Sequence, residues 1–168
     1  MLMLVLRFTH IFCAALWVGM MAFQTFFLLP ALAEAGPDAG KVMQGLMRRR
    51  IPLVMSVIAL IALVSGIWLF LRLSGGQPAA LMATPMGLAL GLGGAVALIA
   101  FLLGFLVMRP AMMRSMRLAE SLASVGAEER ATRAAEIQRL RARGAAVARV
   151  VSTLLLFALA LMAVARYL

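Results

Sequence analysis

Four apolar stretches, each close to twenty residues long, constrain the fold of this chain most strongly. A bilayer has a hydrocarbon core about 30 Å thick and an α-helix rises about 1.5 Å per residue, so about twenty apolar residues cross it. Of the 168 residues, 65% are hydrophobic, against roughly half in a soluble domain. The sequence therefore predicts an all-α polytopic membrane protein, one domain over residues 1–168 with four transmembrane helices in a bundle. The predicted spans are Phe8–Leu29, Ile51–Leu71, Met86–Met108 and Val147–Arg166.

The segment of residues 109–149 is charged but keeps helical periodicity. Gly126 offers a break, and Glu128 and Glu129 favour a new helix start because carboxylates are stabilised near a helix N-terminus. We expect this segment to form a charged helical hairpin that extends the third and fourth helices into the cytoplasm. Spacing along the helix predicts two ion pairs, Glu129 with Arg133 and Glu136 with Arg139.

The distribution of charge predicts how the chain is oriented. The net charge is +10, which in a soluble protein would suggest nucleic acid as a partner, but cytoplasmic loops of membrane proteins also collect Arg and Lys. Residues 30–50 carry four Lys and Arg and residues 109–149 carry nine, while the other side has only Arg7, Arg72 and Arg166. We expect a bacterial inner-membrane protein with both large loops cytoplasmic, both termini periplasmic, the lipid bilayer as partner, and no bound nucleic acid.

Polar residues in the first span are spaced by seven and share one stripe of a helix: His10, Trp17 and Gln24. Lipid offers no hydrogen bonds, so these side chains should point into the bundle or at a partner. They are the candidate cofactor-binding residues, because an ionisable group within a span is by default a functional candidate. Two interpretations of His10 stay open. It ligates copper, haem or a chlorophyll-type pigment, or it is a structural residue near the interface that hydrogen-bonds a carbonyl, a headgroup or water.

Sulfur-bearing side chains flank this stripe. Thiolate and thioether ligands suit Cu(I), so Cys13, Met20 and Met21 join His10 as the candidate metal set. The chain has fourteen methionines but one cysteine and one histidine. Since methionine is a flexible packing residue, packing is the favoured interpretation for most of them. No disulfide or bis-histidine site can form within one chain, and the sequence requires no cofactor.

Pairs of small residues four positions apart let membrane helices approach closely, either within the bundle or onto another protein. No Asp, Glu or Lys lies within a predicted span, which argues against proton relays, coupled transport and intramembrane hydrolysis; no catalytic residue is predicted. The isolated hydroxyls of Ser56, Ser65, Ser152 and Thr153 are expected to bond back to their own helices. The small-residue pairs are Ala15 with Gly19, Gly87 with Gly91, and Ala100 with Gly104.

The segment Leu6–Gly19, LRFTHIFCAALWVG, combines a leucine-rich start, a histidine, and Trp-Val-Gly two turns later. It resembles the first helix of a bacterial membrane family that includes copper-resistance protein D. The Leu29–Pro30 exit and Gly66–Trp68 in the second span are also similar, so the resemblance covers about the first seventy residues. It implies His10 as a metal or haem ligand, and a related four-helix group binds haem and oxidises protoporphyrinogen. The chain departs from the pattern in having no second histidine.

Two hypotheses of function follow. The missing acid–base groups, the small-residue faces and the basic hairpin favour a non-catalytic accessory subunit that packs into a larger membrane complex, respiratory or photosynthetic. The alternative is a copper-resistance-D-like protein that handles copper or binds haem through His10. A small transporter or channel is disfavoured by the lack of intramembrane charge.

The charge asymmetry generates a test of topology. A reporter fused to the C-terminus should be active in the periplasm, and one inserted near Gly126 should be active in the cytoplasm, because thirteen Lys and Arg residues lie on one side against three on the other. Reporter enzymes that work in only one compartment provide the measurement. A cytoplasmic C-terminus would contradict the orientation.

Overall fold

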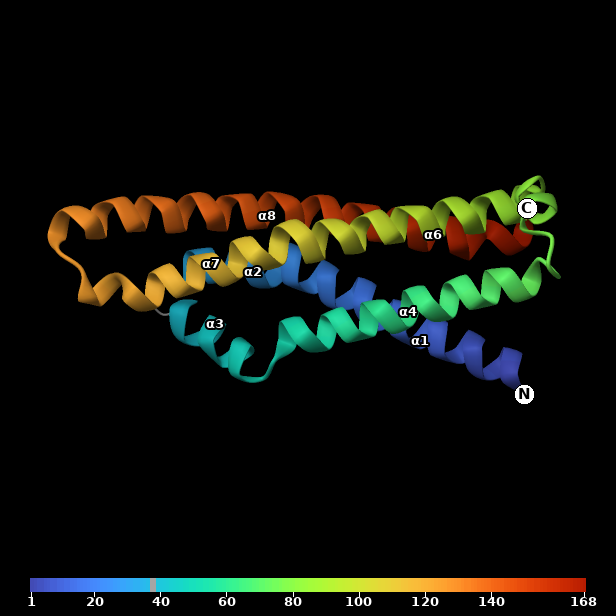
Figure 1. The fold of residues 1–168 in the computed structure, drawn as a ribbon, viewed down its shortest axis with the longest axis horizontal. Coiled ribbons are helices and arrows are strands. Elements are labelled where there is room, and N and C mark those ends of the chain that lie inside the picture. Colours follow the sequence, from blue (N-terminus) through green and yellow to red (C-terminus); the bar gives the residue numbers. More distant parts are fainter. Residues whose placement is uncertain (37–38) are drawn as a thin grey trace.

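The computed structural model describes residues 1–36 and 39–168, and within them the regular structure is helical. Four helical segments are long and apolar enough to cross a membrane, which confirms the predicted class of all-α, multi-pass membrane protein. Both termini lie at one end of the molecule, and the turn between the third and fourth segments lies at the other (Figure 1). The four segments contain the helices α1 (Leu2–Phe23), α4 (Ile51–Leu73), α6 (Pro85–Leu103) and α8 (Ala127–Val164).

Shorter elements extend or connect these helices. Two π-helical turns, Gln24–Leu28 and Gly104–Met108, continue α1 and α6 without a break into α2 (Leu29–Glu34) and α7 (Arg109–Glu120). The connections carry α3 (Ala39–Arg48), α5 (Pro78–Met82) and the 3₁₀ turn Ser121–Ser124, and a second 3₁₀ turn, Ala165–Tyr167, extends α8.

Both π-helical turns precede a proline. The apolar runs of the first and third spans end just before Pro30 and just before Arg109–Pro110, and the helix continues through both prolines. A proline inside a helix lacks the N–H donor and its ring collides with the carbonyl four residues earlier. In each case a π-helical turn ends two residues before the proline. This wider turn changes the hydrogen-bond register, so the proline enters as the second residue of a new α-helical stretch.

The helices pack mainly in two pairs, α1 against α4 and α6 against α8. Gly93 lies at a close approach in the second pair, because a Cβ atom there would lie 3.3 Å from the Ala158 carbonyl oxygen and 3.1 Å from Met162 Cγ. Small residues let backbones approach where hydrophobic burial contributes little, as between membrane helices. The core that joins the two pairs includes Trp17, Ala59, Ala100, Val151 and Leu155.

The short helix α5 folds back onto the start of α6. The turn before it contains Gly75 and Gly76, both with positive φ. A Cβ atom at Gly87 would collide with the Leu81 backbone, and one at Gly91 would collide with the sulfur of Met82. These two glycines therefore leave the space in which α5 of the same chain packs.

Helix α7 and the N-terminal part of α8 lie side by side beyond the apolar spans and form a hairpin (Figure 1). The helix break falls at Gly126, which is the N-cap of α8. Of the two predicted ion pairs, Glu129 with Arg133 forms at 2.6 Å. Glu136 instead pairs with Arg114 of α7 at 2.5 Å, so the prediction of Arg139 as its partner is wrong. The antiparallel neighbour offers a closer guanidinium than the next turn of the same helix does.

A buried cluster of hydroxyls ties α1 to α8. The Ser152 hydroxyl donates to the Met21 carbonyl oxygen across 3.1 Å, and its oxygen lies 2.8 Å from the Thr25 hydroxyl oxygen. Ser56 and Ser65 bond back to carbonyls of their own helix, as predicted, but Ser152 bonds to a neighbouring helix, which corrects the expectation for it. The Met21 carbonyl comes just before the first π-helical turn, where the helix's own ladder changes register.

The serines allow a matched test of this cluster. Ser152→Ala should lower the free energy of unfolding by roughly 0.6 to 1.7 kcal/mol, the average and the maximum measured for interhelical hydrogen bonds in a membrane protein. Ser56→Ala, which removes a bond within one helix, should change it by less than about 0.5 kcal/mol. Unfolding of the chain by SDS in mixed micelles gives both values. Equal effects of the two substitutions would contradict the role assigned to Ser152.

Candidate functional site

His10 lies at the contact between α1 and α4. Its Nδ1 donates to the Ala62 carbonyl oxygen across 2.8 Å, since a carbonyl can only accept. The imidazole also packs over Gly66, where a Cβ atom would come within 2.7 Å of the ring carbon Cε1. The side chain is half-buried. The backbone carbonyl is one of the partners that the structural interpretation of His10 allows.

The candidate metal set does not converge on one point. His10 and Met20 are ten residues apart on one helix, a rise of about 15 Å. Cys13 is buried in the core beside Trp17. Within residues 1–36 and 39–168, no three His, Cys, Asp or Glu side chains gather as a metal-binding group. The structure therefore separates His10 from Met20.

Trp17 is a core residue rather than an exposed one. Its side chain is buried, and its ring meets the edge of the Phe101 ring at a centroid distance of 6.3 Å. This contact joins α1 to α6 across the two helix pairs. Aromatic pairs in this edge-to-face arrangement are favourable beyond the area that they bury.

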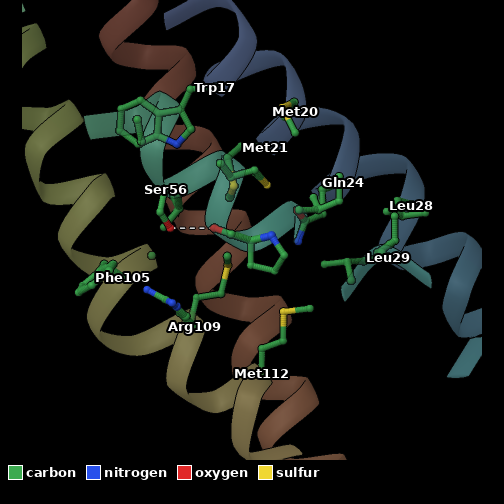
Figure 2. A pocket seen from close by; sticks show the side chains of 18 of the residues that line it. Trp17, Met20, Met21, Gln24, Leu28, Leu29, Ser56, Phe105, Arg109 and Met112 are labelled. Atoms are coloured by element: carbon green, nitrogen blue, oxygen red, sulfur yellow. Dashed lines mark hydrogen bonds between the residues drawn. The ribbon is translucent and has the colours of Figure 1, made fainter. Parts of the chain in front are cut away.

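Trp17, Met20, Met21 and Gln24 come together around an apolar cavity of about 240 Å³ (Figure 2). Trp17 lies toward one end of the cavity and Met112 toward the other. Eight of the fourteen methionines line it, although they are scattered in sequence. We call this space the methionine pocket; its methionines are Met20, Met21, Met43, Met47, Met55, Met108, Met112 and Met113.

The walls of the methionine pocket come from every long helix of the chain. Both π-helical turns contribute to it, through Gln24 on one side and Gly104 on the other, and α3 adds Met43 and Met47. Methionine side chains are unbranched and adapt to irregular shapes. The pocket is therefore suited to a flexible apolar chain.

Among the described residues that line this pocket, three have polar side chains: Gln24, Ser56 and Arg109. The Ser56 hydroxyl is engaged by the Pro52 carbonyl of its own helix at 2.8 Å. Gln24 comes from the first π-helical turn, and Arg109 lies at the edge beside Phe105 (Figure 2), with its guanidinium 5.2 Å from the ring centroid. Such a lining offers no carboxylate, thiol or imidazole for acid–base or nucleophilic chemistry.

A second hollow adjoins the pocket on the surface of α7. It has a volume of about 450 Å³ and shares Phe105, Arg109 and Met113 with the methionine pocket. Arg114 and Arg117 complete its basic lining. We call this space the arginine hollow.

The outer face of α1 has small residues at its centre and bulky side chains on both sides. Ala15 and Gly19 are exposed at its centre, and a Cβ atom at Gly19 would meet no atom within 4 Å. Exposed phenylalanines flank them, stacked at one end as Phe8 with Phe12 and at the other as Phe23 with Phe27. We call this surface the α1 saddle, because small residues lie between bulky ones.

The predicted small-residue pairs thus have three different environments. Ala15 and Gly19 point outward, whereas Gly87 and Gly91 are covered by α5. Ala100 is fully buried in the core, and Gly104 lines the methionine pocket.

Sequence reasoning missed three residues of these sites. Thr25 and Ser152 act as a pair only because α1 and α8 cross there. The charge count places Arg109 only among the loop arginines, although an arginine directly after the last apolar residue of a span is a signal for a headgroup-level side chain.

Comparison with family models, with curated proteins and with solved structures finds no match to this chain. The resemblance to copper-resistance protein D therefore stays an expectation from the first seventy residues.

The contact between His10 and Gly66 generates a double-mutant test. Gly66→Ala should displace the imidazole and lower the free energy of unfolding by about 1 kcal/mol, the order of one interhelical hydrogen bond. His10→Ala should remove most of that cost, since the added methyl group then has room. Gly94→Ala, where the new Cβ atom meets nothing within 4 Å, is the control. Additive effects of the first two substitutions in SDS unfolding would contradict the contact.

Proposed function

We propose that the chain is a non-catalytic accessory subunit of a larger complex in the inner membrane of a bacterium. It docks onto a transmembrane helix of its partner through the α1 saddle. A respiratory or photosynthetic complex, whose subunits are themselves bundles of membrane helices, is the expected host. The observation that carries the proposal is the outward exposure of Ala15 and Gly19 between two phenylalanine pairs.

The polar groups inside the membrane region support a structural role. His10, Thr25 and Ser152 are used in bonds between helices of this chain. In the part of the chain that the structure describes, every buried side-chain nitrogen or oxygen has a hydrogen-bond partner. Catalysis and ion-coupled transport need groups that change partners or charge, and these groups are committed to holding the helices together.

The α1 saddle differs from the outward face of α4. On α4 the exposed side chains include Val57, Leu60, Val64 and Ile67, as expected for a surface that meets lipid chains. Small residues gain little from lipid contact, but they let a second helix backbone come close. The phenylalanine pairs on both sides of Ala15 and Gly19 would then pack against the partner helix.

The proposed orientation follows the charges. Residues 30–50 and the hairpin of α7 and α8 lie in the cytoplasm, and both termini lie in the periplasm. The arginines of the hairpin then meet anionic headgroups or acidic surfaces of the partner as a secondary contact, which salt screens.

Copper or haem binding through His10 is the second candidate. The observation that favours it is the hydrogen bond from Nδ1 to the Ala62 carbonyl, because metal-bound histidines commonly donate their other ring N–H in this way. The second nitrogen, Nε2, would then be the ligand. Further ligands would have to come from another chain or from the cofactor itself.

Substitution in the saddle tests the leading proposal. Ala15→Leu should reduce the fraction of the chain that co-purifies with its partner at least about tenfold, because close helix packing is lost. Ala95→Leu introduces the same side chain at an exposed position of α6 and should have no effect. Purification from native membranes in mild detergent, with quantitative mass spectrometry of the co-purifying subunits, gives the measurement.

Two outcomes would contradict the accessory-subunit proposal. One is a chain that purifies alone from native membranes in every mild detergent. The other is a stoichiometric copper content or Soret absorption band that His10→Gln removes, which would favour the second candidate. Equal loss of the partner with Ala15→Leu and Ala95→Leu would show that docking does not use the saddle.

A further inference from the structure

The methionine pocket and the arginine hollow are continuous through one residue. Arg109 lines both spaces, as do its neighbours Phe105 and Met113. One space is apolar, and the other carries three guanidinium groups. A ligand that fills both must therefore have an apolar chain joined to an anionic group.

The apolar space is large enough for part of a hydrocarbon chain. A cavity of roughly 150 Å³ lined by aliphatic and aromatic side chains takes up benzene, and the methionine pocket measures about 240 Å³. The pocket is elongated, since its wall on α1 and α2 runs from Trp17 to Leu29, a rise of about 18 Å. It is also partly open to the outside, so a chain can enter sideways from the bilayer.

The cationic space is not neutralised by the protein. Of its three arginines, Arg114 pairs with Glu136. Among the described residues, no carboxylate forms an ion pair with Arg109 or Arg117. Three positive charges against one negative charge leave a net attraction for an anion.

The position of this junction along the helices matches the headgroup level of a bilayer. Arg109 follows directly on the apolar run of α6 and its π-helical turn. On the neighbouring helices, Arg50 precedes the apolar residues of α4, and Arg149 precedes those of α8. The methionine pocket thus extends from the headgroup level into the hydrocarbon region, and the arginine hollow lies on its water-facing side.

We infer that this composite site binds an anionic phospholipid. One acyl chain lies in the methionine pocket, and the phosphate lies against Arg109 and Arg117. The adaptable methionine side chains accept chains of different length and unsaturation, while the guanidinium groups recognise the phosphate oxygens through paired N–H donors. A free phosphate would leave the apolar pocket unused, and a zwitterionic lipid would not match the charge. The bound lipid is therefore a structural ligand at the base of the hairpin.

The full-length chain in mild detergent provides the test, with phosphatidylglycerol and phosphatidylcholine of identical acyl chains as probes. Native mass spectrometry of lipid titrations should give phosphatidylglycerol at least about a tenfold tighter binding. Each arginine near an anionic lipid contributes about a fivefold preference. R109Q together with R117Q should therefore abolish the preference. R139Q together with R141Q removes the same charge from exposed positions of α8 outside the hollow and should leave it unchanged.

The acyl-chain half of the site is tested separately. Gly104→Leu adds a side chain where a Cβ atom meets nothing within 4 Å, and because Gly104 lines the pocket, it should weaken the binding of both lipids about tenfold. Gly94→Leu, on the same helix but away from the pocket, is the control. In the unmodified chain, phosphatidylglycerol with a photoreactive group in its acyl chain should label peptides around Met20–Leu29 and Gly104–Met113.

Several results would overturn the inference. Equal affinity for phosphatidylglycerol and phosphatidylcholine would show that the arginines do not select an anionic headgroup. An equal effect of both arginine pairs would assign the preference to the hairpin's overall charge. Full competition by millimolar inorganic phosphate, with no effect of Gly104→Leu, would indicate a free-anion site. Photolabelling spread evenly over the outer faces of α4 and α6 would indicate ordinary bilayer contact.

Discussion

The requirement that every backbone polar group inside the membrane find a partner within the protein underlies the rest of this structure. It makes each apolar span a helix. At Pro30 and Pro110, which lie just beyond the predicted spans, a π-helical turn before each proline keeps the helix continuous. Polar side chains inside the membrane need partners for the same reason, and the hydroxyl of Ser152 and the imidazole of His10 each donate a hydrogen bond to a carbonyl of a neighbouring helix.

Close packing around small residues supplies the cohesion that hydrophobic burial cannot supply in lipid. Gly93 brings α6 against α8, Gly66 makes room for the imidazole of His10, and Gly87 receives α5. Each of these glycines is matched by a partner within the chain. Ala15 and Gly19 are also small, but they are exposed and no described helix of this chain packs against them. This difference is the reason for assigning the α1 saddle as a contact surface.

The methionine pocket is a consequence of how the helices are continued. The two π-helical turns and α3 bring side chains from distant parts of the sequence around one space at the membrane boundary. Flexible thioethers line most of it, and Arg109 connects it to the arginine hollow. A structural subunit and a lipid-binding protein are compatible descriptions of such a chain, because a lipid held at the base of the hairpin would fix the hairpin relative to the spans.

The sequence by itself determined the four apolar helices, the helix start after Gly126 and the ion pair of Glu129 with Arg133, because these depend on hydropathy and on spacing within one helix. Only the tertiary structure decided that Glu136 pairs with Arg114, that Gly91 meets Met82, and that scattered methionines line one pocket. Periodicity defines which residues share a helix face. It does not define which helix lies opposite that face, and the partners of a side chain are set by that neighbour.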